Sequence, residues 1–446
     1  MSHRILLLLI VLMCSTGVLA EWHDYVIEDY CYSPSLALDG AGSPMVVYSD
    51  HVVGVKYATF DGASWYTYPL YDISYGACAN SDLYFDDDGT SHVSMDPAGA
   101  TAYGYVDSTG EWVTEFLPSG SNDDWNSIAL DSDGNPCIAF HDMVSDDFQF
   151  ARRQGSSWEI EVVDAESDVG YCNSMMADDE GVMHVAYCQS GPEYSVRYAV
   201  RDIAGQWSIE EVDTSMYSDP EGTSLALDIW GDPHITYSAS SELRYASLNG
   251  SSWTVETVYA MDTGAAVYGT SLAMDQYGYP HVAHCSATGD YLLYSVNQGG
   301  GWQTDSIANL GSVSDGDPDL ALDELGRPHI AYESRYNGVN LRYIYNDESS
   351  GVEGDGFGEG SISLEAGPVP FSSSVRLVCT MPFGEDYTLR VFDLTGRLVR
   401  EVSSGNAGSG LEEFYWQPGG SVPSGEYIAV LETEFGRTGR KLIYLR

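Results

Sequence analysis

Short apolar runs separated by turn residues dominate the chain between residues 30 and 348. In residues 222–258 an apolar run ends in Asp228, a four-residue turn containing Gly follows, and a second apolar run opens with Pro233-His234. A third run carries a basic residue before an aromatic one, and a fourth begins at Trp253 and alternates. The alternation and the turn residues predict four antiparallel strands, and no helical period is visible.

This four-strand unit recurs seven times. The Asp that ends the first run returns every 45–50 residues or so, which is the period of one propeller blade per repeat, at Asp39, Asp86, Asp131, Asp178, Asp228, Asp275 and Asp323. Four antiparallel strands repeated around a centre form a β-propeller, in which each blade buries its faces against its neighbours. The sequence therefore predicts an all-β fold with a seven-bladed propeller over residues 21–348.

The closure of the ring follows from a missing strand. The Trp of the fourth strand occurs in six repeats, at Trp65, Trp112, Trp158, Trp207, Trp253 and Trp302. The seventh repeat stops after its third strand, whereas a matching segment around Trp22 precedes the first repeat. We therefore expect the N-terminal strand to complete the last blade, which leaves only short, protected edges.

Residues 1–20 have the pattern of a secretory signal peptide. Arg4 supplies the positive charge, residues 5–13 the apolar segment and residues 18–20 the small-residue cleavage site. The apolar run is far shorter than the roughly 20 residues of a membrane span. We expect an exported, monomeric mature chain without a membrane span.

The chain changes character after the seventh repeat. Residues 349–360 are rich in Gly and acid and predict a flexible linker. Residues 361–446 contain alternating runs joined by turns with Gly, Pro and Asp, which predict a small Ig-like β-sandwich.

Four motifs in this last segment carry a family resemblance. GPVPF (367–371), LRVFDLTGRLVREV (389–402), PSGEYIAVLE (423–432) and GRKLIYLR (439–446) resemble the C-terminal sorting domains of type IX secretion substrates, which are similar in fold to the flagellar hook-capping Ig-like domain. The resemblance covers residues 361–446. It implies export across an outer membrane through contact of this domain with the export machinery, often followed by its removal and attachment of the protein to the cell surface. An ordinary Ig-like adhesion module is the alternative.

The charge of the chain excludes several partners. It has 67 acidic and 18 basic residues, for a formal net charge of −49. Binding of nucleic acid or of an anionic membrane through charge is therefore not expected. A solvated, self-repelling surface explains the acidity, and adaptation to salt is the alternative.

Seven cysteines remain after removal of residues 1–20, and this odd number leaves at least one thiol outside any internal disulfide. Cys172 and Cys188 lie on the two arms of a predicted hairpin, where a disulfide could join them. The chain contains no Cys-x-x-Cys pair, so we expect neither a zinc site nor a redox site.

Several polar residues recur with the repeat. Blade symmetry spaces such residues around the ring, so we interpret the histidines as structural rather than as metal ligands: His92, His184, His234, His281 and His329. Each basic residue of a third strand is expected to pair with an acid of the same blade or of the next one. These residues are Lys56, Arg197, Arg244 and Arg342. The turns at Asp86 and Asp131 are too short to encircle an ion and suit tight hairpin turns, so no cofactor is expected, and calcium is the alternative.

Residues that vary between repeats are the better candidates for a site. Propeller sites usually lie on one face, in the loops between blades and between second and third strands. The candidate ligand-binding residues in these loops are Asp50, His51, His141, Asp142, Tyr194, His284, Glu333, Arg335 and Tyr336. No residue is assigned to catalysis or to a metal.

The leading functional hypothesis is a secreted or cell-surface propeller that binds carbohydrate. Its 33 Tyr and 10 Trp residues offer aromatic faces to sugars, although they also pack blades. The repeats resemble those of sialidase-like and lectin-like propellers, and the GSSW turn at residues 250–253 resembles a sialidase Asp-box without its full pattern. A sialidase-like glycoside hydrolase is the first alternative, which requires two carboxylates roughly 5–10 Å apart. A protein-interaction or surface-structural module is the second.

Overall fold

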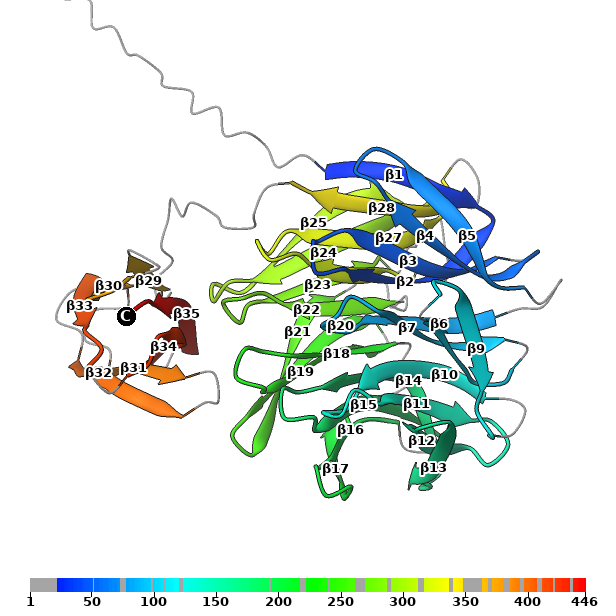
Figure 1. Cartoon of the computed structure of the whole chain (residues 1–446), viewed down its shortest axis with the longest axis horizontal. Coiled ribbons are helices and arrows are strands. Elements are labelled where there is room, and N and C mark those ends of the chain that lie inside the picture. Colours follow the sequence, from blue (N-terminus) through cyan, green and yellow to red (C-terminus); the bar gives the residue numbers. More distant parts are fainter. Residues whose placement is uncertain are drawn as a thin grey trace, which may run out of the picture.

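The chain forms two β-rich parts, a ring of sheets and a smaller C-terminal pair of sheets (Figure 1). This computed structural model describes residues 22–446 except 51, 73–77, 98, 108, 120–122, 192–193, 217–221, 240, 261–268, 287–289, 312–316, 337–339, 348–362, 368–370, 381–385, 394–396, 407–410, 420–421 and 434–435. The predicted signal peptide (1–20) and linker (349–360) lie outside the described residues. Within the described part, no helix is long and apolar enough to span a membrane.

The ring consists of seven four-stranded antiparallel sheets, which confirms the predicted propeller. In six blades the strands lie in chain order, and the first strands of adjacent blades contact one another around the axis. These blades are β2 (Cys31–Leu38), β3 (Pro44–Asp50), β4 (Gly54–Phe60), β5 (Trp65–Asp72); β6 (Cys78–Phe85), β7 (Ser91–Pro97), β8 (Ala102–Val106), β9 (Trp112–Phe116); β10 (Asp123–Leu130), β11 (Pro136–Asp142), β12 (Asp147–Gln154), β13 (Ser157–Asp164); β14 (Asp168–Ala177), β15 (Met183–Ser190), β16 (Ser195–Arg201), β17 (Trp207–Asp213); β18 (Thr223–Leu227), β19 (Pro233–Ala239), β20 (Glu242–Asn249), β21 (Ser252–Ala260); and β22 (Thr270–Met274), β23 (Pro280–Cys285), β24 (Tyr291–Asn297), β25 (Trp302–Asn309).

The seventh blade is built from both ends of the propeller. Its strands lie in the order β1 (Trp22–Asp29), β28 (Asn340–Asn346), β27 (Pro328–Ser334) and β26 (Asp319–Leu322). The antiparallel pairing of β1 with β28 runs from Trp22 opposite Asn346 to Asp29 opposite Asn340. The N-terminal segment therefore supplies the fourth strand that the last repeat lacks, as predicted.

The repeated Asp builds the first turn of every blade. In the first blade Asp39 Oδ1 accepts the backbone N–H groups of Ala41 and Ser43 at 2.9 and 2.8 Å. Gly42 takes a φ of 77°, which Gly adopts without strain, and its N–H donates to the Asp39 carbonyl. The carboxylates of the other six turn aspartates are held in the same way.

The repeated histidines are structural, as expected. His92 places Nδ1 2.6 Å from the Tyr103 hydroxyl and Nε2 3.3 Å from the turn carboxylate of Asp86. Tyr103 in turn packs edge-on against Trp158 of the following blade, with ring centroids 5.7 Å apart. His184 makes the same two hydrogen bonds. His234, His281 and His329 place Nδ1 on a Tyr hydroxyl in the same way, while their Nε2 lies 3.4–3.8 Å from the turn carboxylate.

The C-terminal part is a two-layered β structure, as predicted. One antiparallel sheet contains β29 (Ser363–Gly367), β30 (Val375–Thr380) and β33 (Leu411–Trp416), and the other contains β32 (Leu398–Asn406), β31 (Asp386–Asp393), β34 (Gly425–Thr433) and β35 (Gly436–Tyr444). Leu377 and Trp416 from the first sheet share a buried core with Val391 and Tyr427 from the second. This part lies beside the propeller face that carries the first hairpin turns, where the Arg440 guanidinium is 4.1 Å from the Tyr277 ring centroid (Figure 1).

Cys172 and Cys188 are both buried in one core cluster between the fourth and fifth blades. They are not joined by a disulfide. An irregularity in the strand pairing places Cys188 opposite Tyr171, the residue before Cys172. The hairpin disulfide considered from the sequence is therefore not present in this structure.

Candidate functional site

The mouth of the central channel is a polar pocket to which all seven blades contribute. It lies where the first strands begin, on the face opposite the first hairpin turns. Its volume is about 160 Å³, and each blade supplies the residues six and five positions before its turn Asp. The lining residues are Ser33, Pro34, Asn80, Ser81, Trp125, Asn126, Cys172, Asn173, Gly222, Thr223, Gly269, Thr270, Asp317 and Pro318.

Backbone conformation shapes this mouth. Ser33, Trp125 and Cys172 each have a φ of 49°, and the equivalent Gly222 and Gly269 have φ values of 108° and 56°. Left-handed residues at one structural position break the regular strand where it meets the axis. In the third and fourth blades the strand pairing shifts at this point. The break, rather than the strand tips, which remain paired, thereby frames the pocket in these two blades.

A ring of interblade hydrogen bonds lies next to the mouth, at the residue four positions before each turn Asp. In the first blade this residue is Ser35, whose Oγ accepts the N–H of Leu83 in the second blade at 3.0 Å. The same bond, from a backbone N–H to the preceding blade, is accepted by Asp82, Ser174, Ser224, Ser271 and Asp319. The ring ties neighbouring first strands to one another around the axis.

Two members of this ring are acids on either side of Ser35. Ser35 Oγ lies 3.3 Å from Asp82 Oδ1 and also bonds to Asp319. Withdrawal from water, together with the charge of Asp319, raises the pKa of Asp82 to about 7. Burial likewise raises the pKa of Asp319. The channel therefore contains two close carboxyl groups, which the sequence analysis did not identify.

The mouth also contains polar atoms without partners. Asn126 donates its side-chain N–H to the Asn80 carbonyl at 3.4 Å, but its Oδ1 is buried and accepts no hydrogen bond from a described residue. The same is true of the buried Ser81 Oγ. Ser81, Trp125 and Asn126 all line the pocket, and the Trp125 ring also packs against the core between the fourth and fifth blades. A ligand hydroxyl in the mouth would find an aromatic ring and two hydrogen-bonding atoms.

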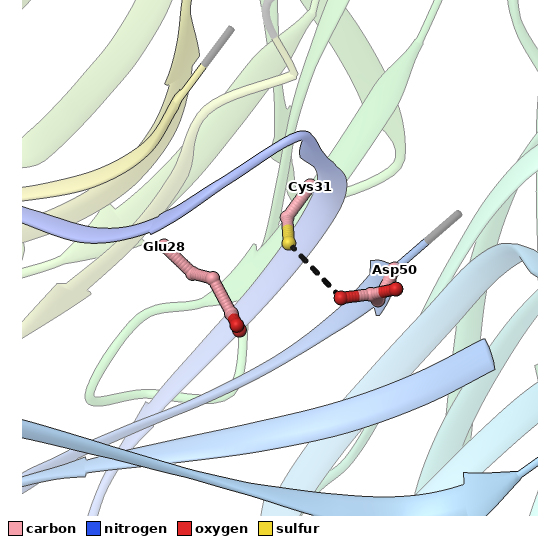
Figure 2. A group of neighbouring side chains, drawn as sticks. All are labelled: Glu28, Cys31 and Asp50. Carbon is pink, nitrogen blue, oxygen red and sulfur yellow. Dashed lines mark hydrogen bonds between the residues drawn. The ribbon is translucent and has the colours of Figure 1, made fainter. Parts of the chain in front are cut away.

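A second polar group lies at the junction of the last and first blades on the same face (Figure 2). Glu28, Cys31 and Asp50 place one donor atom each within 4.8 Å of one another. Lys56 fills this group, with Nζ 2.5 Å from Glu28 and 3.8 Å from Asp50. Burial and then the two carboxylates raise the pKa of the Cys31 thiol, so the thiol stays protonated. Lys56 thus supplies one positive charge to the two carboxylates of this group.

A third group lies between the third and fourth blades. His141, Asp146 and Asp168 also bring three donor atoms within 4.8 Å of one another. His141 is fully buried, and its Nε2 is 3.5 Å from Asp168 Oδ1. The Tyr171 ring covers the imidazole, with centroids 4.2 Å apart.

The residues predicted from the sequence do not form one site. Asp50 and His141 belong to the two separate groups above, and His51 lies outside the described residues. Burial lowers the pKa of His284 to about 3, and its Nε2 bonds to Ser295. The other five lie in three blades. Asp142 holds its own loop and Gln149 in the third, Tyr194 packs on a core cluster in the fourth, and in the seventh Arg335 pairs with Glu333 while Tyr336 is exposed.

The repeated basic residues pair with acids, as predicted, but three of them pair with the preceding blade rather than the next one. Lys56, Arg197 and Arg244 bond to acids of the preceding blade, namely Glu28, Asp164 and Asp213, and Arg342 bonds to Asp24 of its own blade. In each case a Tyr hydroxyl of the second strand shares the acid. These cations are therefore engaged between strands and do not converge on one ligand.

No model of a known protein family matches the chain, and no curated protein matches its sequence. Among solved structures it is similar to the BP39L lectin from Burkholderia pseudomallei, with 12% identity, coverage of 73% of this chain and 98% of the lectin, and a TM-score of 0.56. It is also similar to an ulvan lyase of polysaccharide lyase family PL25 bound to -[GlcA(1-4)Rha3S]-, with 13% identity, 74% and 96% coverage, and a TM-score of 0.52. The chain thus shares its propeller fold with a lectin and a polysaccharide lyase.

Proposed function

We propose that this protein is a secreted or cell-surface carbohydrate-binding propeller that holds one neutral sugar residue in the mouth of its channel. The observation that carries the proposal is the juxtaposition of Trp125 with the unpartnered Ser81 Oγ and Asn126 Oδ1. Buried polar atoms are costly when unpaired, and a sugar hydroxyl would pair with them. An indole beside them offers its face to the C–H groups of the sugar ring.

The size and charge of the mouth define the ligand. Its volume of about 160 Å³ is below the roughly 300–1,000 Å³ of pockets for drug-sized ligands. One sugar unit is therefore the expected occupant. Among the described residues that line the mouth none is basic, and Asp317 is acidic. Together with the net charge of −49, this disfavours sugars that carry a carboxylate or sulfate.

Binding without hydrolysis fits the surroundings better than a sialidase-like reaction. The two channel carboxyl groups, Asp82 and Asp319, accept backbone N–H groups of adjoining blades at 2.8 and 2.6 Å. Moving either carboxylate towards a substrate would break a link between blades. The repeated cations are likewise held in ion pairs, so they do not form the arginine cluster that recognises a carboxylated sugar.

Export is part of the same proposal. The pattern of residues 1–20 and the sorting-domain resemblance of residues 361–446 support it, and the two-layered C-terminal fold is compatible with that resemblance. Mass spectrometry of the protein from its native cells would test both ends. Mature chains beginning near Glu21 are expected, and chains that retain Met1 inside the cell would contradict the proposal.

A glycan array probed with the full chain tests the binding function, with and without chelator. We expect selective binding of glycans with a neutral terminal residue. The variant Ser81→Ala should weaken binding by roughly fivefold, the value of one neutral hydrogen bond. Trp125→Asn should abolish it while keeping a residue that tolerates the left-handed conformation.

Ser94→Ala is the matched control. Ser94 Oγ is also buried without a partner among the described residues, but Ser94 does not line the mouth. Its substitution should leave binding unchanged. Absence of binding to any glycan, or equal affinities of all three variants and the unmodified chain, would overturn the proposal and favour a protein partner.

A further inference from the structure

The group formed by His141, Asp146 and Asp168 has a donor set that differs from the rest of the propeller. It offers one imidazole nitrogen and two carboxylate oxygens, all within 4.8 Å of one another. Asp168 Oδ1 is buried and accepts no hydrogen bond from a described residue. An ionised oxygen withdrawn from water without a donor requires a positive partner.

The three residues are brought together by the junction of two blades. His141 lies near the end of β11, Asp146 in the loop that follows it, and Asp168 at the start of β14 in the next blade. The Asp146 N–H donates to the Asp142 carbonyl at 2.8 Å, and the Asp146 carbonyl accepts the Val169 N–H at 3.2 Å. The loop is thereby tied to the next blade, and the three donors are held in place by backbone contacts.

The group formed by Glu28, Cys31 and Asp50 contains a cation that this group lacks. There, Lys56 stands opposite Tyr48 in the strand pairing and supplies a cation to Glu28 and Asp50. In the third blade the residue at the position of Lys56 is Gln149, opposite Phe140. Gln149 is neutral and donates to Asp142 at 2.9 Å.

The group around Lys56 and the group around His141 therefore differ in net charge. Among the described residues no Lys or Arg pairs with Asp146 or Asp168, and His141 is the basic group in contact with Asp168. Two carboxylates next to a buried imidazole remain without a permanent cation. Arg197, the repeated cation at the junction of the third and fourth blades, pairs with Asp164 and Glu166 instead.

We propose that His141, Asp146 and Asp168 bind a divalent transition-metal ion such as Zn²⁺, Mn²⁺ or Ni²⁺. Mixed imidazole and carboxylate ligands suit these ions, whereas Ca²⁺ takes oxygen ligands. Metal–donor distances of about 2.0–2.2 Å require only a modest approach of the three donors. Because Asp146 is exposed, the remaining coordination positions face solvent. The site shares no residue with the channel mouth, so it is independent of the proposed sugar site.

Isothermal titration of the chelator-treated full chain with Zn²⁺, Mn²⁺ and Ni²⁺ tests this proposal. High salt and excess Mg²⁺ screen the many surface carboxylates. We expect saturable binding of one ion per chain for at least one of the three metals. Co²⁺ bound at the site should give a visible absorption spectrum. Addition of whichever of the three metals binds most tightly should displace Co²⁺ and remove that spectrum.

Two variants locate the ion. Asp168→Asn removes the charge beside His141, and Asp146→Asn keeps a residue that tolerates its φ of 57°. Each should weaken binding at least about tenfold, since even residues that merely support a metal ligand contribute that much. Urea unfolding without metal should show that both variants remain folded.

Asp50→Asn is the matched control, because it alters the junction that contains its own lysine. It should bind the ion as the unmodified chain does. The absence of one-to-one binding for all three metals would overturn the proposal. So would an equal loss of affinity in Asp50→Asn and Asp168→Asn, which would indicate general attraction to an acidic surface.

Discussion

The carboxylate of Asp319 in the last blade accepts the backbone N–H of Leu36 in the first blade at 2.6 Å, across 283 residues of sequence. This bond closes the inner ring, whereas the pairing of β1 with β28 closes the outer edge. The propeller is thus joined at two radii, by a side chain near the axis and by a strand at the periphery.

Asp319→Ala should destabilise the protein by about 1–3 kcal/mol. Leu36 is buried, so its N–H would lose its acceptor without gaining water. Asp319→Asn keeps an oxygen for the bond and should cost less. Urea unfolding at constant pH measures both. Equal and small effects of the two variants would show that this bond does not support the closure.

Glu28→Gln should destabilise the protein by about 2–3 kcal/mol, because it leaves Lys56 with a weaker partner in a mostly buried place. The Tyr48 hydroxyl, 2.5 Å from Glu28, also loses its charged acceptor. Replacing both partners, as Glu28→Gln with Lys56→Met, should recover part of the loss. A double-mutant cycle from urea unfolding gives the coupling, and additive effects would contradict the link between β1 and the first blade.

Asp82 should make the protein less stable as pH rises from about 4 to 8. Its pKa is about 7 in the folded chain against an ordinary value of 3.8, so its contribution to stability is complete below pH 3.8 and is lost as pH rises through 7. Asp82→Asn, which cannot ionise, should therefore gain about 2 kcal/mol over the unmodified chain at pH 8, allowing for water in the channel. Parallel urea series at pH 5 and pH 8 test this, and a gain that is the same at both pH values would refute it.

His329 should make the protein more stable as pH rises, in contrast to Asp82. Burial lowers its pKa to about 4 from an ordinary value of 6.5, so its contribution to stability is present above pH 6.5 and is lost as pH falls through 4. The magnitude is about 2–3 kcal/mol. NMR titration should show a neutral imidazole at pH 5, and His329→Gln should flatten the loss of stability between pH 6.5 and 4. A charged ring at pH 6 would contradict the prediction.

The repeat made the propeller predictable. A turn Asp whose carboxylate accepts two backbone N–H groups acts locally, so its recurrence reports the number of blades. The place of β1 followed from the missing Trp strand of the last repeat. The pairing of repeated cations with neighbouring acids also followed, because residues fixed to a repeat are spread around the ring.

The channel mouth and the metal-ligand group were not predictable in the same way. Ser81 and Asn126 line the same mouth because the pairing of their first strands breaks there, and no turn signal marks such a break. His141 was named as a candidate, but Asp146 and Asp168 come near it only across a blade junction. One sequence signal was available for the channel: Ser recurs four positions before the turn Asp, and Asp82 and Asp319 are the two departures.

The placement of β1 has a consequence for the order of events in time. Ribosomes make the N-terminal strand first, yet its partner β28 lies more than 300 residues later, as in the contact between His23 and Asp347 across 324 residues. At about 5–20 residues per second, that interval is on the order of 15–65 s. During this interval β1 has no partner strand with which to pair. The ring can therefore close only after the seventh blade has been synthesised.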